Sequence, residues 1–123
     1  MARILIVDDD PICRAIAGEA LSAAGHDCRE ADDGDVALAR LATESVDLVL
    51  TDLLMPNKEG IETIMEIRRR WPAIRIVAMS GGSGRAEPDR LLRMAASLGA
   101  DATLIKPVRT GPLVETVERV LKG

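Results

Sequence analysis

The segment DLVLTDLLMP, residues 47–56, carries the strongest indication of the fold. Its first half is a short apolar run, which is typical of a strand covered on both faces of a sheet. The run ends on Asp52, and a turn is expected directly after it. Because a buried carboxylate is costly unless it has a partner, we expect Asp52 to be used at the end of that strand.

Short strand-like runs alternate with helical stretches along the whole chain. The expected strands are RILIV (3–7), DCREA (27–31), DLVLT (47–51), RIVAMS (75–80) and ATLI (102–105). The expected helices cover about 11–24, 35–42, 58–71, 87–98 and 112–122. Repeated βα units with right-handed crossovers predict an α/β fold, a doubly wound (βα)5 sandwich around a five-stranded parallel sheet. DCREA is the most polar strand, so we place it at an edge.

Local signals set the helix boundaries, and helical periodicity indicates which side chains face the core. Pro11 opens the first helix and Gly25 follows it, Pro72 ends the third helix, and Gly99 ends the fourth. The side chains expected to point inward are Ile12, Ile16, Ala20 and Leu21 in the first helix, Ile61, Ile64, Ile67 and Trp71 in the third, and Leu113, Val117 and Leu121 in the last.

Composition narrows the class of protein. A length of 123 residues predicts one domain, residues 1–123, and 47% hydrophobic with 29% charged residues is typical of a globular chain. A net charge of −4 and a single aromatic residue argue against a direct nucleic-acid partner. No apolar run is long enough to span a membrane, and the start MARILIVDDD has no secretory signal, so we expect no membrane contact and a cytoplasmic location.

Chemically active side chains follow four of the five expected strands. Asp8 and Asp9 follow the first strand, Asp52 ends the third, Ser80 ends the fourth, and Lys106 follows the fifth. Ligand sites of open α/β sheets form outside the carboxyl ends of the strands. We therefore expect these side chains to meet in one site.

The three carboxylates predict a bound cation. At an effective dielectric constant near 20, each pair of charges 4 Å apart costs roughly 4 kcal/mol. Oxygen ligands without a thiolate or imidazole favour a hard ion, and Mg²⁺ commonly binds a few carboxylates together with phosphate oxygens. Lys106 and the Ser80 hydroxyl are suited to hold the remaining oxygens of a phosphoryl group. Asp52 is the expected nucleophile, because its strand should be central, and a carboxylate can form an acyl phosphate.

Four motifs in order resemble the receiver domain of two-component response regulators, over essentially the whole chain. ILIVDDDP resembles the acidic pair of that family, LTDLLMPNKEG its phosphoacceptor segment, AMSG its hydroxyl position, and LIKPV its Lys-Pro. The resemblance implies that Asp52 accepts a phosphoryl group from a phosphohistidine on a sensor histidine kinase or a histidine phosphotransfer protein. It also implies Mg²⁺, with Mn²⁺ as a substitute, bound by Asp9, Asp52 and the backbone carbonyl of Leu54, with Asp8 acting mainly through water.

The same resemblance implies further features of the fold and the site. Ser80 and Lys106 bind the phosphoryl oxygens, and the Lys106–Pro107 peptide bond is cis. The sheet order is 2-1-3-4-5, as in flavodoxin-like folds. The protein is a signalling phosphoacceptor with phosphotransfer and autodephosphorylation activity rather than an enzyme acting on a separate substrate. The output partner, or an output domain beyond Gly123, stays open.

Three features depart from the family pattern. Thr103 stands where receivers commonly have the Tyr or Phe that moves inward on activation. The segment GGSGRAEPD, 81–89, makes the interval from Ser80 to Lys106 longer than is common; it is either a moving loop or a tolerated surface insertion. Leu54 and Gly82 stand where the family tunes hydrolysis, and neither side chain can orient a water.

Three other functions match parts of the sequence: a phosphatase, a flavin carrier and a binding module. A phosphatase of the haloacid dehalogenase type has Asp-x-Asp after its first strand, which Asp8 and Asp10 match, but it needs acids after the lysine, and here Glu115 and Glu118 lie on the last helix. Asp10 is the expected cap of the first helix instead. A flavin carrier needs a phosphate-binding loop and aromatic residues that this chain does not have. A receiver-shaped binding module that works without phosphorylation stays open.

The remaining unusual residues are expected to be structural. Cys13 and Cys28 are expected to be packed, reduced thiols. His26 precedes the second strand, far from the expected site, so a phosphoryl-donating imidazole must come from another protein. Trp71 should lie at the opposite end of the sheet from Asp52.

Overall fold

The computed structural model describes residues 1–53, 60–80 and 88–123, with the backbone alone described for residues 88–92. Strands and helices alternate, and the observed boundaries lie within about two residues of those expected from the sequence. The elements are β1 (Arg3–Val7), α1 (Pro11–Ala23), β2 (Asp27–Ala31), α2 (Gly34–Thr43), β3 (Leu48–Asp52), α3 (Gly60–Arg70), β4 (Arg75–Ser80), α4 (Pro88–Ser97), β5 (Ala102–Ile105) and α5 (Thr110–Lys122).

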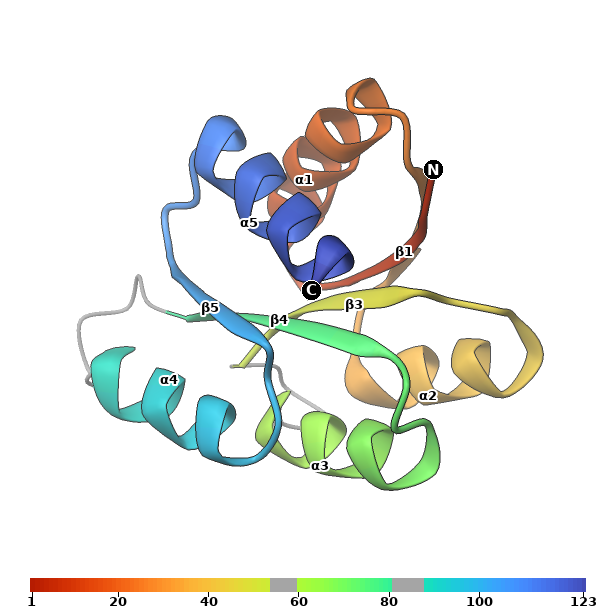
Figure 1. Ribbon diagram of the computed structural model, residues 1–123, viewed down its shortest axis with the longest axis vertical. Coiled ribbons are helices and arrows are strands. Elements are labelled where there is room, and N and C mark those ends of the chain that lie inside the picture. The colour runs from red at the N-terminus through yellow and green to blue at the C-terminus, as the bar shows by residue number, and fades with distance from the viewer. Residues whose placement is uncertain (54–59, 81–87) are drawn as a thin grey trace.

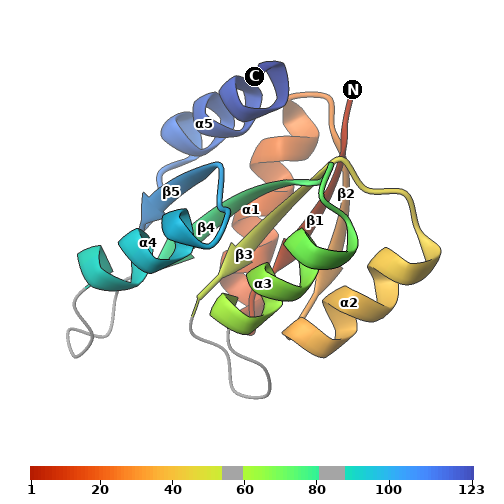
Figure 2. The ribbon, with the colours of Figure 1, turned by 60° about the horizontal axis from the view of Figure 1, so that its bottom comes forward.

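The strands form one parallel sheet in the order β2-β1-β3-β4-β5, which confirms both the predicted order and the edge position of β2. Figure 1 shows α1 and α5 on one face of the sheet and α2, α3 and α4 on the other, and Figure 2 shows the strands side by side from another direction. The central strand β3 is buried along its whole length, as expected for a strand covered on both faces.

Alternate side chains of each strand enter two separate cores. On one face of the sheet Leu5, Val49 and Ile76 pack with Ile64 and Ile67 of α3. On the other face the core is built by Ile4, Ile6, Leu48, Leu50, Val77, Met79, Leu113 and Val117. This division follows from the two-residue period of a strand. In the described part of the chain, no helix is long and apolar enough to cross a membrane.

The predicted inward face of α1 is wrong at two positions. Ile12 is 68% exposed and Ile16 is 48% exposed, whereas Ala17 and Leu21 are buried. The buried residue in the middle of α1 is the small Ala17, because this part of the helix lies close to the sheet: a Cβ atom on Gly18 would lie 3.8 Å from the Cδ1 atom of Ile6. Ile12 and Ile16 therefore face solvent, whereas Leu21, near the end of the helix, enters the core.

The thiols are less buried than expected. Cys13 and Cys28 are both free, as predicted, but each is half-buried. Burial raises the pKa of both thiols, and the hydrogen bond from the Cys13 Sγ atom to Asp10 adds to that effect at Cys13.

Candidate functional site

Strand register brings the predicted site residues to one edge of the sheet. Asp52 lies opposite Met79 in the β3–β4 pair, one residue before Ser80. Ser80 lies opposite Ile105 in the β4–β5 pair, and the Lys106 amide donates to the Ser80 carbonyl at 2.8 Å. The carboxyl ends of β1, β3, β4 and β5 therefore meet, as the sequence predicted.

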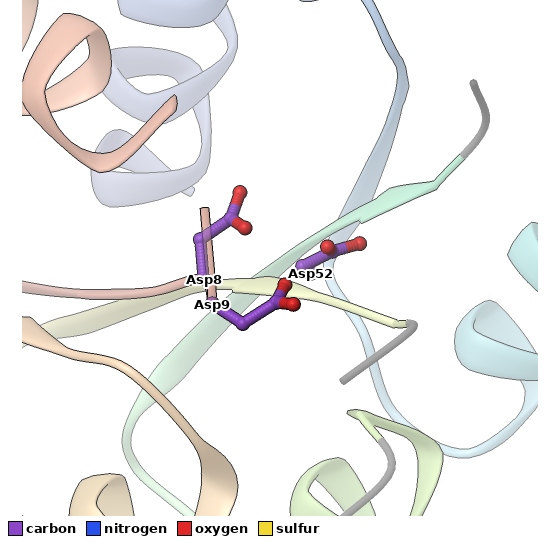
Figure 3. Close-up of side chains that lie close together, drawn as sticks. All are labelled: Asp8, Asp9 and Asp52. Carbon is purple, nitrogen blue, oxygen red and sulfur yellow. The ribbon is translucent and has the colours of Figure 1, made fainter. Parts of the chain in front are cut away.

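The three acids form a tight cluster. One oxygen each of Asp8, Asp9 and Asp52 lies within 4.8 Å of the other two. Figure 3 shows the Asp9 carboxylate extending from the end of β1 toward Asp52 at the end of β3. Asp8 is 1% exposed and Asp52 is 7% exposed, whereas Asp9 faces solvent. Two charges are thus buried and the third lies at the mouth of the cluster.

Lys106 bridges the two buried acids. Its Nζ atom lies 2.8 Å from Asp8 Oδ2 and 3.2 Å from Asp52 Oδ2. Burial by itself lowers the pKa of the ammonium, but the hydrogen bond to Asp8 and the charge of Asp52 outweigh that effect, and the pKa is raised above its ordinary value of 10.5. Lys106 is therefore fully charged at neutral pH, and among the described residues its ammonium pairs with Asp8 and Asp52 but not with Asp9.

The hydroxyl of Ser80 is buried without a partner. Ser80 is 1% exposed, and among the described residues its Oγ atom has no hydrogen bond. A buried polar atom without a partner is uncommon and needs an explanation. A hydroxyl at the edge of the acid cluster is ready to donate to an oxygen that enters the site.

The loop after β1 is held by short-range hydrogen bonds. The Asp10 amide donates to Asp8 Oδ1 at 3.0 Å. Asp10 Oδ1 accepts the Ile12 amide at 2.9 Å and Oδ2 accepts the Cys13 thiol at 3.3 Å, and these bonds lower the pKa of Asp10. Asp10 is thus the predicted helix cap, and in the described part of the chain the acid cluster consists of Asp8, Asp9 and Asp52 without it. This use of Asp10 counts against a dehalogenase-type Asp-x-Asp site.

Two residues shape the site in ways that the sequence reasoning did not assign. A Cβ atom on Gly60 would lie 2.3 Å from the Asp52 carbonyl oxygen and 2.5 Å from Leu53 Cα, so α3 approaches the end of β3 closely because residue 60 is glycine. Arg14 of α1 donates to the Asp8 carbonyl. The acceptor of Arg14 is a backbone atom, which no side-chain pattern identifies.

Other predictions for the site have mixed outcomes. The Lys106–Pro107 bond is cis, as predicted. Leu54, Gly82 and most of the 81–89 segment lie outside the described residues, so the predictions made for them stay predictions. Thr103 lies on β5 opposite Ala78 and is half-buried.

His26 and Trp71 lie away from the acids, as predicted. The Ala2 amide donates to His26 Nδ1 at 3.2 Å, and His26 Nε2 lies 3.6 Å from Glu118, at the amino end of the sheet. Trp71 follows the last residue of α3 at the same end. The chain has no other histidine or aromatic residue.

The donor set fits a hard divalent cation. All candidate ligand atoms are carboxylate oxygens, which Mg²⁺ prefers to nitrogen or sulfur. Two of the carboxylates are buried, so their charges are poorly screened by solvent. Among the described residues, one ammonium, that of Lys106, offsets only part of the charge of these three carboxylates, so a cation near Asp9 and Asp52 is electrostatically favoured.

Comparison with known proteins identifies the family. Residues 4–118 match the model of the response regulator receiver domain. The transcriptional regulatory protein CpxR of Klebsiella pneumoniae is 39% identical over 99% of this chain and 50% of its own length, and the sensor histidine kinase RcsC of Salmonella typhi is 35% identical over 97% of this chain and 13% of its own length. The chain thus spans about half of one relative and a small part of the other.

The solved structures agree with the sequence comparison. The crystal structure of a CheY-like response regulator receiver domain protein from Methanospirillum hungatei matches with a TM-score of 0.89 and 27% identity, covering 99% of this chain and 94% of that one. The flavodoxin-like sheet order and the match over residues 4–118 lead to one conclusion. This chain belongs to the family of response regulator receiver domains.

Proposed function

We propose that residues 1–123 form a single receiver domain that acts as a phosphoacceptor in a two-component phosphorelay. The domain takes a phosphoryl group onto Asp52 in a Mg²⁺-dependent reaction and then signals to a partner or an output domain. One observation carries the proposal: three carboxylates lie within 4.8 Å of one another, Lys106 pairs with two of them, and beside them lies a buried hydroxyl that has no partner among the described residues. That arrangement favours binding a cation together with an anionic group.

The cation-binding residues are the acids of the cluster. Asp9, Asp52 and the backbone carbonyl of Leu54 would bind the cation directly, and Asp8 would bind it mainly through water. Mg²⁺, or Mn²⁺ in its place, neutralises the charge on the phosphoryl oxygens when it is bound. The closeness of the three carboxylates, with that of Asp9 extending toward Asp52, supports this assignment (Figure 3).

The transfer step uses Asp52 as the nucleophile. A carboxylate oxygen of Asp52 forms a bond to the phosphorus atom of a phosphohistidine, the bond from phosphorus to the imidazole nitrogen breaks, and that nitrogen keeps the electron pair and takes up a proton. Lys106 moves from the carboxylates toward a phosphoryl oxygen, and the Ser80 hydroxyl donates to another. This reaction needs positioning and charge neutralisation rather than further covalent chemistry.

The phosphoryl donor is another protein, a histidine kinase or a histidine phosphotransfer protein. The single histidine of this chain, His26, is held at the opposite end of the sheet. Beside the acid cluster, Ile12 and Ile16 of α1 are exposed, and a cavity of about 260 Å³ adjoins Lys106. Its lining is Asp8, Cys13, Ile16, Ala17, Met79, Lys106, Pro107, Val108 and Leu113. This apolar surface is suited to a protein that brings its imidazole to Asp52.

Signalling follows from the movement of Ser80 and Lys106 toward the modified Asp52. To convert a 1:99 population into 99:1, the phosphoryl group must favour one state by roughly 5.5 kcal/mol, and a few charge-assisted hydrogen bonds are of that size. Thr103 is too small to replace the usual aromatic switch by filling the same space. We therefore expect the change to pass through β4, β5 and the fourth helix without a ring movement.

The test is direct modification by a small phosphodonor. Wild type, Asp52→Asn and Asp10→Asn are incubated with acetyl phosphate and Mg²⁺, and intact mass is measured. We expect wild type and Asp10→Asn to gain one phosphoryl group and Asp52→Asn to gain none. Removal of Mg²⁺ with a chelator should abolish the gain. Asp10→Asn is the matched control because it keeps the cap and lies next to the acid pair.

Each result has a defined meaning. Failure of the wild type to gain mass favours the receiver-shaped binding module. Loss of modification in Asp10→Asn, together with turnover of an aryl phosphate, favours the dehalogenase-type mechanism. Ser80→Ala should still be modified but should show a smaller change in amide chemical shifts around β4 and β5, and an unchanged response means that coupling does not use this hydroxyl.

A further inference from the structure

Arg14 joins the end of β1 to the edge strand β2. Its Nη1 atom donates to the Asp8 carbonyl oxygen at 2.7 Å, and its Nε atom donates to Glu30 Oε1 at 3.0 Å. The Arg14 side chain is only 19% exposed, whereas that of Glu30 is 53% exposed. The guanidinium is thus a fixed fork that holds a backbone carbonyl, with Glu30 setting its orientation.

The contact with Arg14 completes the restraint of Asp8. The Asp8 amide donates to the Ala31 carbonyl at 3.1 Å, and its two carboxylate oxygens accept from Asp10 and Lys106. With the carbonyl held by Arg14, the plane of the peptide unit between Asp8 and Asp9 is fixed. The position of the Asp9 Cβ atom depends in part on that plane.

Asp9 depends on its backbone for its position. It is exposed, and in residues 1–53, 60–80 and 88–123 no hydrogen bond to its carboxylate is seen. Its carboxylate nevertheless points at Asp52 (Figure 3). The peptide unit before Asp9, which Arg14 holds, is the restraint nearest to this carboxylate among the described residues.

We propose that Arg14 is a positioning residue for the divalent cation: by holding the Asp8 carbonyl it aims Asp9 at Asp52 and sets the Mg²⁺ affinity of the site. This inference rests on the proposed function, because it assigns Mg²⁺ to the acid cluster. Groups that orient metal ligands commonly change metal affinity by about 10- to 100-fold when they are removed.

The direction of the change in Mg²⁺ affinity on substitution of Arg14 distinguishes a positioning role from an effect of its charge alone. Arg14 is a cation near a cation site, so loss of its charge alone would strengthen Mg²⁺ binding. Loss of the hold on the Asp8 carbonyl would weaken Mg²⁺ binding, because Asp9 no longer points at Asp52. The two explanations therefore predict opposite changes in the same measurement.

The experiment measures Mg²⁺ affinity without phosphorylation, by calorimetry and by NMR titration of backbone amides. We expect Arg14→Met to raise the Kd for Mg²⁺ by about 10-fold. Arg14→Lys should fall between wild type and Arg14→Met, because lysine keeps the charge and one donor but has no fork. Arg70→Met is the matched control: Arg70 pairs with Glu66 at 3.6 Å on α3, and its loss should leave the Kd unchanged.

A double-mutant cycle tests whether Arg14 acts through Asp9. In an Asp9→Asn background, Arg14→Met should change the Kd much less than it does in wild type. An Arg14→Met variant that stays folded by its amide spectrum and binds Mg²⁺ as tightly as wild type, or more tightly, overturns the inference. The same holds for a full effect in the Asp9→Asn background. If wild type itself binds no Mg²⁺, the proposed function fails at the metal site.

Discussion

Two charge clusters lie at opposite ends of the same sheet and are built in opposite ways. At the amino ends of β4 and β5, Arg68 donates to the carbonyl oxygens of Pro72 at 2.8 Å, Ile74 at 2.9 Å and Gly99 at 2.6 Å. It also pairs with Asp101 at 3.2 Å. Here one cation meets one carboxylate and three carbonyls, so its charge and its donors are satisfied.

The cluster at the carboxyl ends is unbalanced. Among the described residues, Lys106 pairs with Asp8 and Asp52 but not with Asp9, so these three carboxylates and one ammonium together carry about −2, and the Ser80 hydroxyl has no partner there. The balanced cluster, Arg68 with Asp101 and the three carbonyls, connects the segments that contain these residues, and the charge of Arg68 is paired with that of Asp101. The unbalanced cluster keeps unsatisfied charge that a cation and a phosphoryl group can satisfy. Substitutions at the two ends of the sheet should therefore change stability and phosphorylation differently, and for one pair of carboxylates the changes in stability should have opposite signs.

The largest expected effect comes from Gly60→Ala. The new Cβ atom would lie 2.3 Å from the Asp52 carbonyl oxygen, so backbone must move. We expect the free energy of unfolding, measured with urea, to fall by about 3 kcal/mol or more. The control is Gly111→Ala at the start of α5, where an added Cβ meets nothing within 4 Å, and helix propensity predicts no loss. Equal stability of the two variants would show that α3 can retreat from β3 without cost.

The next effect tests the balanced cluster. Arg68→Met leaves the carbonyls of Pro72, Ile74 and Gly99 without their donor, and we expect a loss of about 2–3 kcal/mol in urea unfolding. Modification by acetyl phosphate should be unchanged while the protein is folded. Arg70→Met removes a neighbouring arginine whose side chain is 42% exposed and should cost less than about 1 kcal/mol. A slower modification of Arg68→Met would mean that the two ends are coupled.

Neutralising Asp52 and neutralising Asp101 should change the free energy of unfolding in opposite directions. Without divalent cations, Asp52→Asn should raise the free energy of unfolding by about 1 kcal/mol at neutral pH, because one of three crowded charges is removed. Mg²⁺ should reverse this gain by stabilising the wild type alone. Asp101→Asn should destabilise the protein, because Asp101 Oδ2 accepts both the Ile76 amide and Arg68. Thermal unfolding of both variants checks the signs, and a destabilised Asp52→Asn would contradict the unbalanced description.

A smaller effect concerns alkaline pH. The raised pKa of Lys106 means that its charge stabilises the fold fully below its ordinary pKa of 10.5, and that this contribution is lost as the pH rises through the folded-state value above 10.5. The stability difference between wild type and Lys106→Met should therefore stay constant from pH 8 to about pH 10 and narrow above it. The chain has no tyrosine, and a Cys13→Ala background in both proteins removes the thiol whose pKa the charge of Lys106 affects. A stability difference between wild type and Lys106→Met that widens above pH 10 would contradict a raised pKa of Lys106.

The sequence predicted the fold and the acid cluster because both depend on features of single strands. Four of the five strands are apolar runs, and parallel strands place their carboxyl ends together, so Asp52 and Lys106 could be assigned to one site. The inward face of α1 was wrong, because its close approach to the sheet buries Ala17 rather than Ile16. Arg14 and Arg68 could not be assigned, since their acceptors are mainly backbone carbonyls that tertiary structure brings within reach.

The smallest expected effect is on the fluorescence of Trp71. Its ring lies at the amino end of the sheet, packs against the core and has the Arg70 guanidinium 4.4 Å from its centroid, so no contact changes when Mg²⁺ binds at the other end. We expect almost no change in Trp71 emission on addition of Mg²⁺. Ile105→Trp is the positive control, because residue 105 is exposed and precedes Lys106, which should leave Asp8 and Asp52 when charge is supplied. A strong Mg²⁺-dependent quench of Trp71 in the wild type would mean that α3 carries the change along the sheet, and that the balanced cluster takes part in the switch.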